Sequence, residues 1–225
     1  MPKVVGISGS ERLRGNTEQF VQRALDIISE YGIETELITI ADKKIVSGCT
    51  GCFWCRANRA ECPIKDDFMP IWRKMYEADG IILGAPVYLG SVPAKMKGVL
   101  ERACILSEGR EIDNVDGPVE DLGWPITEKP PGLFYRKIGG AIATTRRTGA
   151  SATLAELLMW FMINNFIVVG SSYWTVGIGT TRVKKKGRKT VTEHTKNMIE
   201  TDVEGAVTIK HFAENFAWLI NKIKK

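Results

Sequence analysis

The stretch 4-VVGISGSERLRGNTEQFVQRALDIISEYG-32 decides the fold class. It opens with the short β-branched run VVGIS, which is typical of a buried strand. Small and polar residues follow over 9–17, and from Thr17 onward apolar residues recur at steps of three and four, as on one face of a helix. Gly32 is a suitable C-cap for that helix. A strand, a polar loop and a helix in this order predict the first unit of a parallel α/β sheet.

The same alternation continues along the rest of the chain. We expect further strands at 34–40, 79–88, 137–145 and 166–172, and helices at 66–78, 93–106, 150–165 and about 190–224. Residues 109–135 are rich in glycine and proline and are predicted to form a long loop. Five strands alternating with helices predict a doubly wound parallel sheet, and we expect a single domain over 1–225. Such sheets bind ligands beyond the carboxyl ends of their strands, which directs attention to the loops there.

Composition limits the class of protein. Hydrophobic residues make up 44% of the chain and charged residues 25%, which is ordinary for a soluble globular protein. No run of 18 apolar residues occurs, so we expect no membrane span. The N-terminal residues lack the features of a secretory signal, so we expect a cytoplasmic protein without stable disulfides.

The net charge of +5 is concentrated in 182–189 and in the last five residues. We interpret these segments as a solvated basic loop and a basic helix end. A docking face for an acidic protein partner is the alternative. No nucleic-acid-binding motif accompanies the charge, so we do not expect nucleic acid as a partner.

The first polar loop suits a terminal phosphate. A helix N-terminus offers unpaired N–H groups and the positive end of the helix dipole. The loop adds hydroxyl, amide and guanidinium donors from Ser8, Ser10, Arg12, Arg14, Asn16 and Thr17. It matches neither the Walker pattern nor G-x-G-x-x-G, and its density of donors suits a phosphate monoester such as that of FMN. A polar turn that merely caps the helix is the alternative.

Two further loops follow predicted strands at the same edge of the sheet. In 85-APVYLGSVPAKMKGVLER-102, two prolines and Gly90 form a turn that presents backbone groups and Tyr88. A flat heteroaromatic ring needs such backbone donors and acceptors together with aromatic cover. The segment 144-TTRRTGAS-151 adds hydroxyls, guanidinium groups and Gly149 at another helix start. A partly buried core tyrosine is the alternative for Tyr88.

Four of the five cysteines lie in 49-CTGCFWCRANRAEC-62, spaced C-x2-C-x2-C-x6-C. Such a set of cysteines can bind zinc, a [2Fe-2S] cluster or a [4Fe-4S] cluster, or can form disulfides. Structural zinc usually pairs two C-x2-C knuckles a dozen or more residues apart. Three cysteines on one tight loop, with a fourth farther along, suit the corners of a cubane. We therefore expect a [4Fe-4S] cluster in the loop 47–65, with the ligands Cys49, Cys52, Cys55 and Cys62.

Three other residues near this motif have simpler interpretations. Phe53 and Trp54 either shield the cluster from water or pack in the ordinary way. Cys104 is expected to be a small buried apolar residue.

No side chain is predicted to be catalytic, because the only histidines are His194 and His211 and no carboxylates are paired as an acid and a base.

The segments GSERLRGNT, APVYLGSVPAKMK and GGAIATTRRTGAS resemble the NADPH-dependent FMN reductase branch of the flavodoxin-like superfamily. Together with the cysteine motif, the chain resembles the iron–sulfur flavoproteins of anaerobic archaea and bacteria from residue 3 to about 172. The resemblance implies a five-stranded flavodoxin-like sheet of order 2-1-3-4-5, with a cysteine-rich insertion after strand 2 and a C-terminal extension over 173–225. It also implies one FMN, a [4Fe-4S] cluster and a homodimer or homotetramer.

The resemblance also assigns site residues by position. It implies phosphate contacts from Ser8, Ser10, Arg12, Asn16 and Thr17. It implies contacts to the flavin ring from Pro86, Val87, Tyr88, Leu89, Gly90 and Ser91, and from Thr145, Arg146, Arg147, Thr148 and Gly149. The family's fourth loop is richer in glycine than TTRRTG, which is a departure from the pattern.

This pair of cofactors favours an electron-transfer enzyme. A cubane ordinarily exchanges one electron and a flavin one or two. We expect single electrons to pass from a ferredoxin-like donor through the cluster to FMN, and on to a small acceptor such as oxygen, peroxide or a quinone. The resemblance implies detoxification of oxygen or peroxide, and a cluster that serves the FMN of a neighbouring subunit.

Two other functions are alternatives. The first is an NAD(P)H-dependent FMN or quinone reductase whose cysteines bind a structural metal, although no dinucleotide signature occurs in the chain. The second is a cluster-based redox sensor, for which only the basic segment 182–189 provides support.

Overall fold

The computed structural model describes residues 1–58, 61–108, 132–179, 181–186, 189–194 and 197–223. Five parallel strands form the central sheet in the order β2-β1-β3-β4-β5. They are β1 (Lys3–Ser8), β2 (Glu34–Thr39), β3 (Gly80–Pro86), β4 (Ile138–Thr145) and β5 (Ile167–Val168). The expected parallel sheet and its strand order are therefore confirmed.

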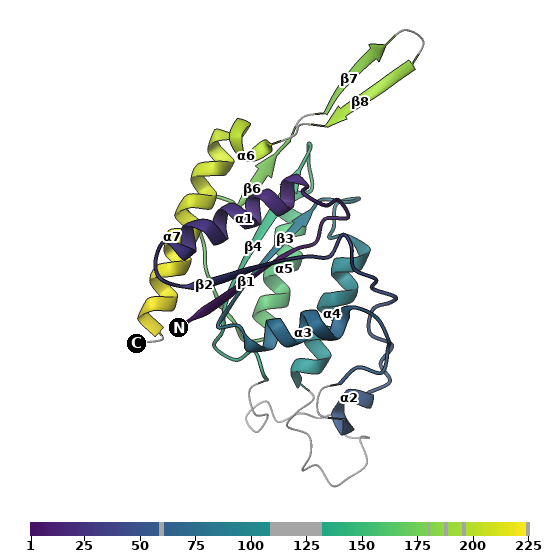
Figure 1. Cartoon of the computed structure of the whole chain (residues 1–225), viewed down its shortest axis with the longest axis vertical. Helices are drawn as coiled ribbons and strands as arrows, with labels where there is room; N and C mark the ends of the chain where they lie inside the picture. Colours follow the sequence, from purple (N-terminus) through teal and green to yellow (C-terminus); the bar gives the residue numbers. More distant parts are fainter. Residues whose placement is uncertain (59–60, 109–131, 180, 187–188, 195–196, 224–225) are drawn as a thin grey trace.

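Helices cover both faces of this sheet (Figure 1). One face packs against α1 (Asn16–Ser29) and α7 (Val203–Ile223). The other packs against α3 (Phe68–Glu77), α4 (Ala94–Glu108) and α5 (Ala150–Ile163). Side chains of a strand alternate between faces, so Ile81 and Leu83 of β3 enter the second core while Ile82 enters the first.

The last strand of the sheet is shorter than predicted and is followed by one that the sequence did not suggest. Only Ile167 and Val168 pair with the beginning of β4. The chain then leaves the sheet and returns as β6 (Val176–Ile178), which pairs in parallel with the end of the same strand. The two short strands thus share one edge of β4.

The prediction of a basic loop at 182–189, and of a helix from about 190, was wrong. These residues form an antiparallel hairpin of β7 (Thr181–Lys186) and β8 (Lys189–His194). Figure 1 shows the hairpin projecting from the body of the chain. Both segments contain β-branched valines and threonines, which favour strands, among their lysines. The helical region begins only with α6 (Met198–Thr201), before α7.

The loop predicted at 109–135 lies mostly outside the described residues. Its described end forms a turn that places Phe134 in the core, fully buried. Among the described residues, no helix combines the length and the apolar character that a membrane span requires.

Candidate functional site

The three polar loops meet at one edge of the sheet because their strands are in register. Ser8, the last residue of β1, lies beside Gly84 of β3, and Pro86 lies beside Thr144 of β4. The backbone N–H of Gly9 donates to Gly84 O (2.7 Å), and that of Val87 donates to Thr144 O (2.8 Å). The strand pairing therefore continues into the loops and holds them together at the carboxyl edge.

The hydroxyl groups of the first loop are buried at this edge. Ser8, Ser10 and Thr17 are nearly fully buried, and Ser8 Oγ has no hydrogen-bond partner among the described residues. Ser10 Oγ accepts from the backbone N–H of Arg12 (3.0 Å). The hydroxyls of Thr17 and Thr144 are 2.5 Å apart, which joins α1 to β4. A buried hydroxyl without a partner, at the start of a loop that leads into a helix N-terminus, suits an incoming phosphate oxygen.

Two other predicted phosphate contacts are placed differently. Asn16 Oδ1 accepts a hydrogen bond from the backbone N–H of Met198 (3.2 Å), so this side chain connects α1 to α6. Arg12 is exposed beside the loop. The structure thus brings the hydroxyls of the loop together, whereas the amide oxygen of Asn16 has a contact within the fold.

The third loop is a tight turn from Tyr88 to Ser91. The backbone groups of these two residues exchange hydrogen bonds of 2.9 and 3.1 Å, and Leu89 and Gly90 between them have positive φ. Tyr88 is 38% exposed, so its ring is partly open to solvent beside this turn. The turn thus presents an aromatic ring and backbone groups at the sheet edge.

The fourth loop contacts the third. Gly149 has a φ of +87°, and a Cβ there would lie 2.8 Å from Val87 Cγ1 and 3.1 Å from Gly90 Cα. Thr145 donates from its hydroxyl to Thr148 O (2.9 Å), while Arg146 and Arg147 are exposed. Only a residue without a side chain permits this close approach of the two loops.

Glu156 of α5 positions the third loop, and no pattern in the sequence predicted this role. Its Oε2 accepts from the Ser91 hydroxyl (2.6 Å) and from the Val92 backbone N–H (3.2 Å). Its Oε1 is 2.8 Å from Lys97 Nζ. Burial raises the pKa of Glu156, but the bonds from Lys97, Ser91 and Val92 outweigh it and leave that pKa below its ordinary value. An ionised carboxylate therefore holds the loop at neutral pH.

The four cysteines of the motif line one pocket beside α4. The pocket holds about 310 Å³, part of it open to solvent, and Arg102 and Phe53 also line it. The short helix α2 (Trp54–Ala57) carries Cys55, which is 5% exposed. No disulfide joins any of the five cysteines, all of which are described. The structure thus brings Cys49, Cys52, Cys55 and Cys62 together around one pocket.

The pKa values of two of these thiols are shifted by their surroundings. Burial raises the pKa of Cys55, and the nearby Cys49, Cys52 and Cys62 raise it further. A hydrogen bond from the Trp54 backbone and one from Thr50 lower the pKa of Cys52. Thiolates that crowd one another in this way are stabilised by a cationic metal centre.

The aromatic residues of the motif and the fifth cysteine have different surroundings. Phe53 and Trp54 are 48% and 53% exposed, so ordinary packing in the core is excluded for both. Arg56 lies over the Phe53 ring, 4.2 Å from its centroid. Cys104 is partly buried on α4 and packs against the core, as expected.

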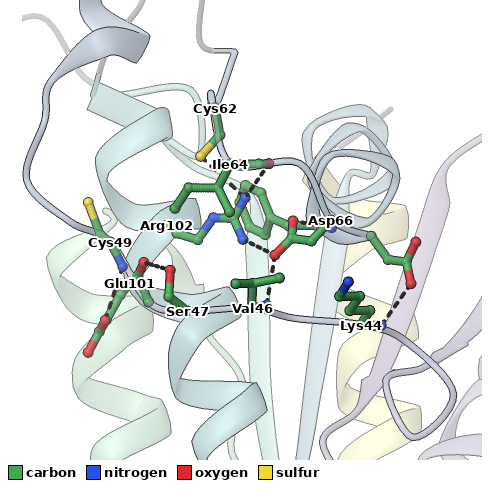
Figure 2. A network of polar contacts seen from close by, with 12 residues as sticks. Lys44, Val46, Ser47, Cys49, Cys62, Ile64, Asp66, Glu101 and Arg102 are labelled. Atoms are coloured by element: carbon green, nitrogen blue, oxygen red, sulfur yellow. Dashed lines mark hydrogen bonds and ion pairs between the residues drawn. The ribbon is translucent and has the colours of Figure 1, made fainter.

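Neighbouring residues of α4 connect to both ends of the cysteine motif (Figure 2). The backbone N–H of Cys49 donates to Glu101 Oε2 (3.3 Å), and Arg102 Nη2 donates to Cys62 Sγ (3.2 Å). Gly98 permits the preceding segment to pack closely on the helix, since a Cβ there would lie 3.2 Å from Ser47 O. A charged residue among the apolar positions of α4 is the signal that could have identified Arg102 from the sequence.

The residues of the pocket fit an iron–sulfur group. All four donors are thiols, and Arg102 Nε is buried in the same pocket with no hydrogen-bond partner among the described residues. In the described part of the chain, no three His, Cys, Asp or Glu side chains meet the geometry for a single metal ion.

The chain matches a family of flavin enzymes and curated iron–sulfur flavoproteins. Residues 2–181 match the family described as NADPH-dependent FMN reductase, so the chain is an FMN-dependent oxidoreductase. It is 36% identical to an iron-sulfur flavoprotein of Methanocaldococcus jannaschii over 99% of this chain and 100% of that protein. The chain belongs to the iron–sulfur flavoproteins of the NADPH-dependent FMN reductase family.

Solved structures agree on the fold. The chain resembles RosB with its bound intermediate at a TM-score of 0.68, with 16% identity, covering 100% of this chain and 81% of that one. It resembles a flavodoxin from the domain Archaea at a TM-score of 0.53, with 12% identity and 99% of each chain covered. Together with the strand order, these likenesses show a flavodoxin-like fold.

Proposed function

We propose that this chain transfers single electrons from a low-potential donor of the ferredoxin type, through a [4Fe-4S] cluster, to FMN. The cluster ligands are Cys49, Cys52, Cys55 and Cys62. FMN binds at the carboxyl edge of the sheet, with its phosphate at the first loop and its ring at the third and fourth loops. Reduced FMN passes electrons to a small acceptor such as oxygen, peroxide or a quinone.

The observation that carries this proposal is the gathering of four cysteine thiols around one pocket beside α4. The N-terminal end of the same helix follows the third loop, where the ring of FMN is proposed to bind. Arg102, which lines the pocket, is eight positions after Ala94, or about 12 Å along the helix from its first residue at 1.5 Å per residue. An electron carrier and a flavin site on one rigid helix support transfer between them.

The proposed donor follows from charge. The chain has a formal net charge of +5, which favours encounter with an acidic protein. Phe53 and Trp54 are exposed in the cysteine segment and provide apolar contact beside the cluster ligands. A small acidic iron–sulfur protein suits such a surface.

The direct test mixes the anaerobic holoprotein with reduced ferredoxin and follows the visible spectra of cluster and flavin. We expect the cluster absorbance to change first and the flavin to bleach after it. The variant Cys52→Ser, in which an exposed ligand is lost, should keep FMN but show no bleaching by ferredoxin. Cys104→Ser is the matched control and should behave as the unaltered protein. No flavin reduction in a protein that contains both cofactors would refute the proposal.

The family description itself favours a second function, in which NADPH reduces FMN directly. Hydride transfer needs an open flavin face and no cluster. In that case NADPH would bleach the flavin of Cys52→Ser as fast as that of the unaltered protein. Under our proposal, NADPH bleaches the flavin of either protein much more slowly than reduced ferredoxin bleaches the flavin of the unaltered protein.

A further inference from the structure

Arg102 is an unusual residue to find inside this fold. Its side chain is 1% exposed and is the largest among the fully buried side chains of the described residues. It lies on α4, between the apolar core and the pocket that the four cysteines line. A permanently charged group in such a position needs a compensating environment.

One side of the guanidinium group is held by the fold. Nη1 forms an ion pair with Asp66 Oδ2 at 2.6 Å, and the Phe68 ring lies 4.0 Å below the guanidinium carbon. Asp66 also accepts from the backbone N–H of Val46 (3.0 Å) and of Phe68 (3.1 Å). These bonds outweigh the effect of burial and keep the pKa of Asp66 below its ordinary value. The ion pair therefore has a fixed orientation, which Figure 2 shows.

The other side of the guanidinium group faces the cysteines. Nη2 donates to Cys62 Sγ at 3.2 Å and to Ile64 O at 3.4 Å. Nε has no partner among the described residues, although it is buried. In the planar fork of an arginine, Nε–H and one N–H of Nη2 point to the same side. Nε–H therefore points to the same side as one of the two N–H groups of Nη2, the nitrogen that donates to Cys62 Sγ and to Ile64 O.

Stability alone does not explain this arrangement. A buried ion pair is weak evidence for stability, because apolar residues of similar volume often serve equally well. A buried N–H without an acceptor is a further cost. A sulfur-rich anionic group in the pocket would remove this further cost, because its sulfur atoms can accept a hydrogen bond from Nε–H.

We propose that Arg102 is a positioning residue of the cysteine site, which fixes the Cys62 thiolate and donates its Nε–H to a sulfur of the bound cluster. This inference rests on the proposed function, because it takes the four cysteines to hold an iron–sulfur cluster. Four thiolates make such a cluster negative, and reduction adds a further negative charge. Hydrogen bonds to the sulfurs and a nearby positive charge therefore favour the reduced state and raise the reduction potential.

The Asp66 carboxylate acts in the opposite sense. Its negative charge partly offsets the arginine, so the two residues should move the potential in opposite directions. A role in folding alone predicts no such opposition, because removal of either partner leaves the other charge buried. This difference in sign is the basis of the test.

The experiment measures the reduction potential of the cluster by anaerobic redox titration followed by electron paramagnetic resonance. The proteins are the holoprotein, Arg102→Gln, Asp66→Asn, the double variant and Arg102→Lys. Iron, sulfide and FMN are counted in each sample, and the FMN potential serves as an internal control. FMN is proposed to bind at the far end of α4, so its potential should change little.

We expect Arg102→Gln to lower the ratio of reduced to oxidised cluster at a fixed potential about tenfold or more, which is about 59 mV for one electron. Asp66→Asn should raise that ratio, and the double variant should lie between the two. Shifts of the same sign in both single variants, or no shift, would overturn the inference.

Arg102→Lys keeps the test decisive if Arg102→Gln does not fold or loses its cluster. Lysine retains the charge but lacks the planar fork that reaches Asp66 and Cys62 together. A lower potential in a folded, cluster-containing Arg102→Lys supports the role of the fork, and an unchanged potential overturns it. A holoprotein without iron and sulfide would instead refute the proposed function, and that result is read from the cofactor counts before any potential is measured.

Discussion

The carboxyl edge of the sheet, where FMN is proposed to bind, and the cysteine pocket are built in different ways, although both contact α4. At the edge, the backbone of three paired strands sets the position of the loops, as the bonds from Gly9 to Gly84 and from Val87 to Thr144 show. At the pocket, side chains set the position of the loop, through Arg102, Asp66 and Glu101. A site fixed by strand register tolerates side-chain changes, whereas a site fixed by a few polar contacts depends on each of them.

This difference predicts that the two sites can be damaged separately. The first loop, the third loop and the fourth loop belong to one continuous sheet edge, while the cysteine motif lies between β2 and α3. Variants can therefore be chosen that change only one of the two cofactors.

The largest effect should come from loss of a proposed cluster ligand. We expect Cys52→Ser to lower iron and sulfide at least about tenfold, because a cubane held by four cysteine thiolates loses one of its anchors. FMN content should be unchanged, since Cys52 lies outside the loops where FMN is proposed to bind. Colorimetric iron and sulfide assays, with flavin absorbance, measure this. Cys104→Ser is the matched control, and loss of iron from it as well would contradict the assignment of the ligands.

A pair of glycine variants should separate the sites in both directions. Gly149→Ala places a Cβ within 2.8 Å of Val87 at a φ of +87°, and the left-handed backbone alone costs about 1 to 2 kcal/mol. We expect FMN affinity to fall roughly tenfold while iron content is kept.

Gly51→Ala is the counterpart in the cysteine loop. Its φ is +67° and no atom lies within 4 Å of the new Cβ, so the backbone strain acts without a clash. This variant should lose iron more readily and keep FMN. Titration with FMN and iron release to a chelator test the pair, and a loss of both cofactors in both variants would show that the sites are not separate.

Glu156→Gln should destabilise the third loop in a manner that depends on pH. The pKa of Glu156 is below its ordinary value in the folded chain, so its stabilisation is present above about pH 4.3 and is lost as the pH falls through the lowered pKa. Its side chain is 23% exposed, which limits the expected loss at pH 7 to about 1 kcal/mol.

Thermal unfolding at pH 7 and at about pH 4 measures this contribution. The difference between Glu156→Gln and the unaltered protein should narrow at the lower pH. Lys97→Met, which removes only the exposed partner, should have a smaller effect at pH 7. A difference that grows on acidification would contradict the assigned role of the carboxylate.

The smallest effect should come from Glu101→Ala. This exposed carboxylate accepts one hydrogen bond of 3.3 Å from the Cys49 backbone, and exposed contacts of this kind contribute less than about 1 kcal/mol. We expect cluster loss to a chelator to be only a few times faster than in the unaltered protein. Cluster loss as fast as in Arg102→Gln would contradict this prediction, because Glu101 would then hold the cysteine loop as strongly as Arg102 does.

Much of the fold could be predicted from the sequence because strand and helix periods are local signals. The alternation that begins at Val4 predicts the parallel sheet, and the resemblance supplies its order. The strand β6 has only three residues, too few to show alternation. In β7 and β8, the many lysines led to the prediction of a basic loop instead of strands. The polar loops and the cysteine motif could also be identified from the sequence, because each is continuous in the chain.

The residues that hold those loops in place could not be predicted in the same way. Glu156 reaches Val92 across 64 positions, and Arg102 reaches Asp66 across 36. Such pairs are brought together only by the packing of α4 and α5 on the sheet, which no local pattern encodes. For the same reason, the sequence alone names no partner for Asp66.

The most direct test counts iron, sulfide and FMN in one sample of the chain purified without oxygen, with its visible and electron paramagnetic resonance spectra. Two separate cofactor sites predict about four irons, four sulfides and one FMN per chain, with broad absorbance near about 400 nm beneath the flavin bands. Zinc in place of iron, or a cysteine pocket that holds no metal while FMN is bound, would contradict the proposed electron path.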